Sequence, residues 1–114
     1  MAKRIILTAV LLVFVLSFAF AFANQQTVVE RGKALFNDPS FAGGIKSCNK
    51  CHPNGRGLKE AGSKTKFNIM GEEQNSLEEA INVCIVNANK GNAIEVDSSE
   101  MQDMVSYIKS LGQK

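Results

Sequence analysis

Apolar residues form one long block at the start of the chain and then recur at helical spacing. The block covers residues 5–22 and is almost unbroken. Beyond it, apolar residues three and four positions apart predict helices over residues 29–36, from 76 to about 89, and from 98 or 99 to 111. No run of alternating apolar and polar residues is long enough to predict a strand. The pattern therefore indicates an all-α domain behind an apolar leader.

Two of these helices have predicted starts and inner faces. Ser76 and Glu79 have the spacing of a capping box, and Gly91 is expected to stop the helix that follows. The apolar face of that helix is Leu77, Ala80, Ile81, Cys84, Ile85 and Ala88. In the last helix, Glu100 and Asp103 favour the positive N-terminal end. Its inner face is Met101, Met104, Val105, Ile108 and Leu111.

The leader has the features of a bacterial-type secretory signal peptide. Lys3 and Arg4 precede the apolar block, and Ala21-Phe22-Ala23 is a small-x-small cleavage site. This predicts a signal peptide over residues 1–23 and a single domain over residues 24–114. The block is also long enough for an uncleaved membrane anchor, so that alternative stays open. In both cases we expect an exported, periplasmic domain, which contacts a membrane only if the leader is retained.

The chemistry of the chain is concentrated in Cys48-Asn49-Lys50-Cys51-His52, over which a short helical turn is expected. Two cysteines separated by two residues and followed at once by histidine have the spacing for covalent haem attachment. The two thiols can reach both vinyl groups of one porphyrin, and His52 then lies under the iron as its proximal ligand. No other histidine occurs in the sequence. The motif therefore predicts one covalent haem c.

Three other interpretations of this motif have less support. A thioredoxin-like redox pair would follow a strand in a βαβ pattern, and no strand-rich run precedes Cys48. A closed zinc site needs four ligands, and Cys84 is the one further cysteine. A disulfide between Cys48 and Cys51 would close a strained small ring and leave His52 without a role.

The segment after the motif and the charge distribution both suit a bound porphyrin. Residues 53–68 are expected to form a long glycine-containing loop over a haem edge, with Leu58, Phe67 and Ile69 as its apolar contacts. Without Lys3 and Arg4, eleven basic and eleven acidic residues remain in the sequence. Residues 31–66 carry eight basic and two acidic residues, whereas residues 67–114 carry three basic and eight acidic residues.

This asymmetry suggests a docking surface. The residues expected to form a basic rim beside the motif are Lys46, Lys50, Arg56 and Lys59. Such a rim would steer an acidic redox partner towards the haem edge, although a merely solvated face is an equal alternative. Nucleic-acid binding has no support, because the sequence has neither a basic helix nor interleaved aromatic residues.

Taken together, these features resemble a class I, monohaem cytochrome c over the whole of residues 24–114. The matching positions are Gly32 and Phe36, the Cys48-to-His52 motif, and Val105-x-Tyr107-Ile108-x-x-Leu111. The resemblance implies a small fold of about four short helices around one covalent haem. It also implies that the first and last helices cross closely, with the glycine allowing contact and the aromatic residues filling the crossing.

The sequence departs from that family at the distal iron ligand. Where the family places a methionine before the last helix, this chain has Ile94. Met101 and Met104 are expected to serve core packing. Met70, in the loop before residue 76, and Cys84 remain as candidate ligands, and an open or otherwise ligated iron is a further alternative.

A second resemblance bears on this choice. Asn82-Val83-Cys84 and Ser98-Ser99-Glu100-Met101 are similar to stretches of the haem-bearing sulfur-oxidation subunits and thiosulfate dehydrogenases, whose distal ligand is cysteine. This resemblance covers the C-terminal half and implies Cys84 as the distal ligand. A thiolate ligand lowers the reduction potential of the iron, whereas a thioether ligand raises it.

The sequence thus predicts a periplasmic electron carrier that is not itself an enzyme and that meets other redox proteins. One alternative is a haem subunit of an enzyme that oxidises inorganic sulfur compounds, with Cys84 at the iron. Another is a haem sensor with an open distal site.

Overall fold

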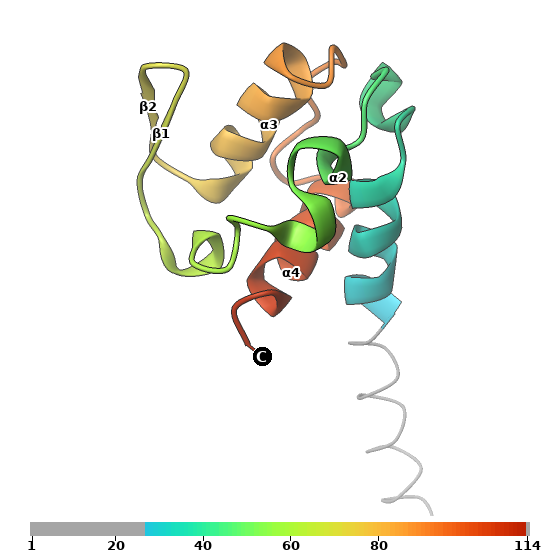
Figure 1. Ribbon diagram of the computed structural model, residues 1–114, viewed down its shortest axis with the longest axis horizontal. Helices are drawn as coiled ribbons and strands as arrows, with labels where there is room; N and C mark the ends of the chain where they lie inside the picture. The colour runs from blue at the N-terminus through green and yellow to red at the C-terminus, as the bar shows by residue number, and fades with distance from the viewer. Residues whose placement is uncertain (1–26, 114) are drawn as a thin grey trace, which may run out of the picture.

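The computed structural model describes residues 27–113 (Figure 1). Both the predicted signal peptide and its cleavage site lie outside the described residues. The α-helices are an N-terminal helix over residues 27–37, α2 (Cys48–Cys51), α3 (Leu77–Asn87) and α4 (Ser99–Ser110). The strands β1 (Phe67–Ile69) and β2 (Glu72–Gln74) form one antiparallel hairpin. The prediction of a mostly helical domain is confirmed.

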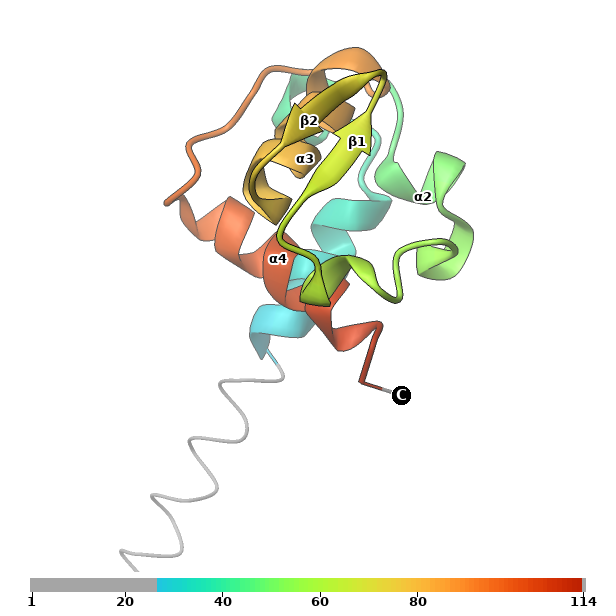
Figure 2. The same cartoon turned by 90° about the vertical axis from the view of Figure 1, so that its left-hand side faces the viewer.

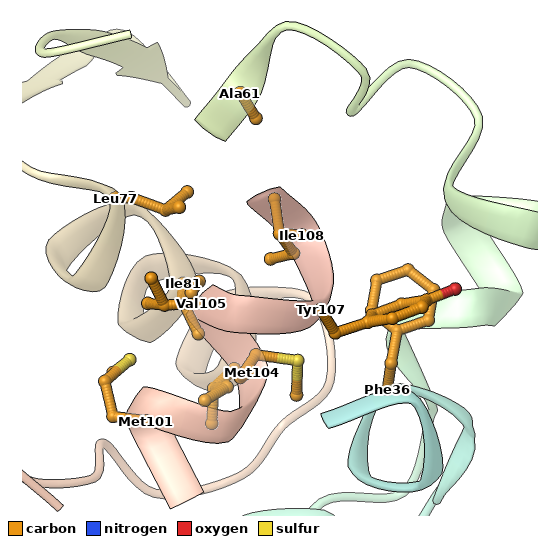
Figure 3. Packing of buried hydrophobic residues seen from close by; sticks show 10 residues of the cluster. Phe36, Ala61, Leu77, Ile81, Met101, Met104, Val105, Tyr107 and Ile108 are labelled. Atoms are coloured by element: carbon orange, nitrogen blue, oxygen red, sulfur yellow. The ribbon is translucent and has the colours of Figure 1, made fainter. Parts of the chain in front are cut away.

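The N-terminal helix lies beside α4 in Figure 1. Gly32 is buried at the contact between the two helices. A Cβ atom on Gly32 would clash with the backbone carbonyl of Asp103 and lie 2.8 Å from the Cβ of Tyr107. Next to this contact the rings of Phe36 and Tyr107 pack edge to face, with centroids 5.1 Å apart (Figure 3). Arg31 closes the crossing through two hydrogen bonds to the Asp103 carboxylate, of 2.7 and 2.9 Å. The expected role of Gly32 and the aromatic pair is confirmed.

The start of α3 follows the predicted capping box. The Ser76 hydroxyl accepts a hydrogen bond from the Glu79 amide at 3.1 Å, and the Glu79 carboxylate accepts one from the Asn75 amide at 2.8 Å. The apolar face of α3 packs against α4. Leu77, Ala80, Ile81 and Ile85 are buried along that face, and Cys84 is half-buried.

The end of α3 differs from the prediction. The left-handed residue is Lys90, with φ 61°, rather than Gly91. The Gly91 amide instead donates to the Ile85 carbonyl at 2.9 Å, and a Cβ there would lie 2.9 Å from the Ala42 carbonyl oxygen. Gly91 is therefore needed for close packing of the loop after α3 against residues 41–44, and the backbone reverses one residue earlier.

The core lies between α3, α4 and the N-terminal helix. Ser98 caps α4 by accepting a hydrogen bond from the Met101 amide at 3.2 Å. The buried inner face of α4 consists of Met101, Met104, Val105, Tyr107 and Ile108, as Figure 3 shows. Their positions agree with the predicted stripe, to which Leu111 adds a half-buried side chain.

The hairpin corrects the expectation that the domain has no strand. Its two strands pair Phe67 with Gln74, Asn68 with Glu73 and Ile69 with Glu72. Met70 and Gly71 form the turn with φ 57° and 85°, the positive values that a tight two-residue hairpin turn requires. Strands of three residues are too short to produce a recognisable alternation of apolar and polar positions. The hairpin contacts α3, in front of which it lies in Figure 2.

The segment between α2 and the hairpin is more ordered than the predicted structureless loop. It contains two short 3-10 turns, Pro53–Gly55 and Ala61–Ser63, and a third, Phe41–Gly43, precedes α2. Ala61 is buried, and a Cβ on Gly62 would lie 2.8 Å from the Cα of Lys109, so this segment packs directly on α4. Among the described residues, no helix is long and apolar enough to cross a membrane.

Candidate functional site

An open apolar cavity lies among the N-terminal helix, α2, α3, α4 and the hairpin. The apolar side chains that line it are Phe36, Leu58, Phe67, Ile69, Leu77, Ala80, Ile81, Met104 and Ile108. Three polar or reactive side chains share the lining, namely Cys48, His52 and Cys84.

The short helix α2 places the residues of the cysteine motif. Cys48 and Cys51 are three residues apart, the spacing of neighbours on one helical face. The His52 amide donates to the Cys48 carbonyl at 2.9 Å, which ends the helix. Cys48 is half-buried and lines the cavity, whereas Cys51 is exposed and lies outside the lining. The motif therefore presents one thiol inside the cavity and the other at the surface.

The imidazole of His52 is oriented by the backbone. Its Nδ1 atom lies 3.1 Å from the carbonyl oxygen of Arg56. A carbonyl oxygen only accepts hydrogen bonds, so Nδ1 carries the proton and Nε2 keeps its lone pair. Metal-binding histidines are commonly held in this way by a hydrogen bond at the second ring nitrogen. Nε2 is thus the nitrogen with which His52 can bind a metal.

The Cys48 thiol is held at its sulfur by Asn89. The Asn89 side-chain amide donates to the Cys48 Sγ atom at 3.5 Å. Burial raises the pKa of the Cys48 thiol, and this outweighs the opposite effect of the hydrogen bonds from Asn89 and the backbone. Cys48 is consequently a neutral thiol near pH 7 in the chain alone.

Cys84 approaches the same cavity from α3. It forms no disulfide and is half-buried. Burial raises the pKa of its thiol, and Cys48 and Cys51 raise that pKa further when they are themselves ionised. An ionised Cys84 therefore needs a nearby positive charge, such as a metal ion that coordinates the sulfur.

The other candidate sulfurs and the residue at the usual methionine position are placed differently. Met70 lies at the hairpin turn, is 68% exposed and is not part of the cavity lining. Met101 and Met104 are fully buried core residues, as predicted, and Met104 also contacts the cavity. Ile94 does not line the cavity, because its backbone is held on α3. The Asn82 side-chain amide donates to the Ile94 carbonyl at 2.8 Å, and the Ile94 backbone amide donates to the Asn82 Oδ1 atom at 2.9 Å.

The residues of the predicted basic rim, Lys46, Lys50, Arg56 and Lys59, are all exposed. Lys46 and Lys50 flank Cys48, and Arg56 follows His52 by four residues. The four residues are therefore close to the motif in the sequence, and their exposed side chains can contact solvent or a partner.

Two polar residues near the cavity were not identified from the sequence. Asn89 contacts Cys48, although nothing in the sequence distinguishes it from the neighbouring asparagines. Gln74 is buried, and its Oε1 atom has no hydrogen-bond partner in the described part of the chain. Because Gln74 pairs with Phe67 across the hairpin, both side chains lie on the same face of the sheet, and Phe67 lines the cavity.

The lining and its donors fit a porphyrin. A porphyrin has two large apolar faces, and the cavity is lined by aliphatic and aromatic side chains of the N-terminal helix, the hairpin, α3 and α4. Thiols react with vinyl groups to give thioethers, and Cys48 and Cys51 are free thiols. Imidazole nitrogen and thiolate sulfur are both iron ligands in haem proteins, and His52 and Cys84 face the same cavity.

A comparison with protein families agrees with this fit. A family model described as SoxA/TsdA, cytochrome c domain, matches residues 31–114. No curated protein and no solved structure matches the chain. The match confirms the resemblance to the haem domains of sulfur-oxidation subunits and thiosulfate dehydrogenases. It also extends that resemblance from the C-terminal half to almost the whole domain.

Proposed function

The chain belongs to the SoxA/TsdA cytochrome c domain family, and from this premise we propose that it is an exported carrier of single electrons with one covalent haem c. Haem-based electron transfer is the function of a cytochrome c domain. One observation carries the finer proposal. Cys48, His52 and Cys84 come from two separate elements and line the same apolar cavity.

Each residue of the motif has a distinct role in this proposal. Cys48 and Cys51 form thioether bonds to the haem, and His52 binds the iron through Nε2. The Arg56 carbonyl keeps the imidazole in the required tautomer. When bound, the haem supplies the one-electron chemistry, while the protein sets its potential and excludes water from it.

Cys84 is the proposed distal ligand. It lines the cavity from α3, whereas Met70 is turned towards solvent at the tip of the hairpin. The iron charge offsets the burial that otherwise keeps this thiol neutral. A thiolate in this position favours the ferric state, so the proposed carrier works at low potential.

Mass spectrometry and a haem stain of exported protein test the attachment. We expect one added porphyrin on the wild type and its loss in the Cys48→Ala, Cys51→Ala double variant. A His52→Ala variant is expected to keep the covalent porphyrin in part but to lose its low-spin spectrum. Wild-type protein that carries no added porphyrin would contradict the proposal.

Ferric absorption and electron paramagnetic resonance spectra test the distal ligand. Cys84→Ala is expected to abolish the low-spin thiolate signature, and Met70→Leu serves as the matched control with an unchanged spectrum. A spectrum altered by Met70→Leu, with the long-wavelength charge-transfer band of methionine ligation in the wild type, would assign Met70 instead. A high-spin wild-type spectrum would favour the open site of a haem sensor.

A second function is a haem subunit in the oxidation of inorganic sulfur compounds. The family match and the position of Cys84 favour this assignment. In this case the chain is not an enzyme by itself. It accepts electrons from a partner protein that binds and oxidises the substrate. Co-purification of a partner together with thiosulfate-dependent reduction of the haem would support it, and reduction that needs no partner would exclude it.

A further inference from the structure

Asn89 is a buried polar residue directly after α3, and it lies against the attachment motif. It is 4% exposed, and its side-chain amide nitrogen lies 3.5 Å from the Cys48 Sγ atom. Its backbone amide and carbonyl are also hydrogen-bonded. The Asn89 amide donates to the Cys84 carbonyl at 3.0 Å, and its carbonyl accepts from the Ile45 amide at 2.9 Å. Asn89 therefore connects the end of α3 with the segment that enters the motif.

A buried side-chain amide is costly unless its polar atoms are paired. The backbone contacts of Asn89 hold the loop without any help from its side chain, so a small apolar residue would serve the loop equally well. The contact that needs an asparagine is the one to sulfur. The function of the Asn89 side chain is therefore its hydrogen bond to the Cys48 sulfur.

The direction of this hydrogen bond suits the attached state of Cys48. A thioether sulfur has lone pairs and no hydrogen, so it can accept a hydrogen bond but cannot donate one. The amide nitrogen of Asn89 is the donor in the contact. The bond therefore persists when the thiol becomes a thioether, with the sulfur as acceptor throughout.

We propose that Asn89 is a positioning residue that hydrogen-bonds the Cys48 thioether sulfur and thereby raises the reduction potential of the haem. The inference rests on the proposed attachment of haem to Cys48. A hydrogen bond donated to the sulfur draws electron density away from the edge of the porphyrin. Lower electron density at the ring favours ferrous over ferric iron, and hydrogen bonds of this kind are one of the ways a protein tunes a haem. The effect of Asn89 opposes that of a distal thiolate.

Redox titration of two Asn89 variants tests this role. Asn89→Leu removes the donor at similar volume, and Asn89→Asp keeps the shape but places an acceptor oxygen against the sulfur. We expect each to raise the ferric-to-ferrous ratio at fixed applied potential by about threefold. At 59 mV per tenfold change for one electron, this is a fall of roughly 30 mV. The matched control is Asn87→Leu, because Asn87 is exposed at the end of α3, two residues before Asn89, and its side chain donates to the Val83 carbonyl.

The expected control result is an unchanged potential, together with unchanged ferric spectra in all three variants. The inference would be overturned if Asn89→Leu had the same reduction potential as the wild type. It would also be overturned if Asn89→Leu and Asn87→Leu shifted the potential equally. A merely structural role would change stability but leave the potential in place.

A measurement on the wild type covers the case in which the Asn89 variants do not fold. In the diamagnetic ferrous protein, one side-chain amide proton of Asn89 is expected to exchange slowly with solvent, whereas those of Asn87 exchange fast. Fast exchange at Asn89 would overturn the inference while leaving the attached haem in place. Absence of a covalent porphyrin by mass spectrometry would instead overturn the proposed function and this inference together.

Discussion

At the scale of single residues, Gly32 determines how closely the N-terminal helix approaches α4. Alanine has a higher intrinsic helix propensity than glycine, so Gly32→Ala alone would stabilise the N-terminal helix by about 1 kcal/mol. However, the added methyl meets the Asp103 carbonyl, which is backbone and cannot rotate away. Overpacking of this kind costs about 1–3 kcal/mol, so we expect a net loss of unfolding free energy, measured by denaturant titration.

The neighbouring position provides the control for this substitution. Lys33 lies on the same helix and is exposed, so Lys33→Ala is expected to change the unfolding free energy by less than about 0.5 kcal/mol. Equal stability of Gly32→Ala and Lys33→Ala would show that the two helices can separate at the crossing without cost.

Gly32 and Phe36 were identified from the sequence because their roles follow from residue type and spacing. The roles of Gly91 and Lys90 could not be found in this way. A glycine after a helix usually indicates a left-handed residue, but here Lys90 takes that conformation and Gly91 packs against Ala42. Which of two adjacent residues reverses the chain depends on the loop that packs there, and this is tertiary information.

At the scale of elements, α4 depends on the cap at its first turn. The Ser98 hydroxyl accepts from the Met101 amide and donates to the Glu95 carbonyl at 2.7 Å. Ser98→Ala leaves the Met101 amide unpaired, so we expect the unfolding free energy to fall by about 1 kcal/mol. Thermal or denaturant unfolding measures this change. Ser99→Ala is the matched control, because its hydroxyl contacts the exposed Glu100 side chain and caps no helix.

The two long helices were predictable from the sequence, whereas the hairpin was not. Ser76, Glu79 and Ser98 are local signals, and the apolar stripes behind them extend over several turns. The hairpin has three residues in each strand and a turn of Met70 and Gly71. Methionine is an unusual residue for positive φ. The two-residue turn requires this conformation, and a methionine at that position gives no signal of it in the sequence.

The hairpin and the segment of residues 53–66 also respond to the contents of the cavity. Leu58, Phe67 and Ile69 face it, and they lose packing partners when no haem is attached. In the Cys48→Ala, Cys51→Ala double variant, we expect faster amide hydrogen exchange in these segments and a lower denaturation midpoint than in the wild type. Exchange mass spectrometry measures both regions against α4, which is packed on its other side by the core. Equal loss of protection in α4 and the hairpin would contradict a local role of the cavity.

At the scale of the whole molecule, the fold brings three of the residues singled out in the sequence, Cys48, His52 and Cys84, to one cavity. The spacing of Cys48, Cys51 and His52 is a local pattern with one common chemical use. Cys84 was also proposed from the sequence. It follows His52 by 32 residues, and the fold brings both side chains to the same cavity. Asn89 could not be proposed, because its contact with Cys48 depends on how α3 ends. The reactive residues can therefore be identified from local motifs. Their neighbours in the cavity depend on how α3 packs, which the sequence alone does not give.

The charge distribution of the whole molecule predicts how small redox reagents approach it. Lys46 and Lys50 flank the attachment motif and are exposed. We expect the Lys46→Gln, Lys50→Gln double variant to react more slowly with an anionic oxidant such as ferricyanide, by about threefold to tenfold at low salt. Its rate should also depend less on ionic strength, because fewer positive charges remain to be screened. Stopped-flow oxidation of the ferrous protein measures both effects, and a cationic oxidant should show the opposite change.

A second double variant separates a local rim from net charge. Lys33→Gln with Lys109→Gln removes the same charge from the N-terminal helix and α4, where both lysines are exposed. If electrons leave beside Cys48 and Cys51, this control variant slows the anionic oxidant much less than the variant of the motif lysines. Equal slowing in both variants would mean that only the total charge matters. Lys46 and Lys50 would then not form a specific docking surface for a partner.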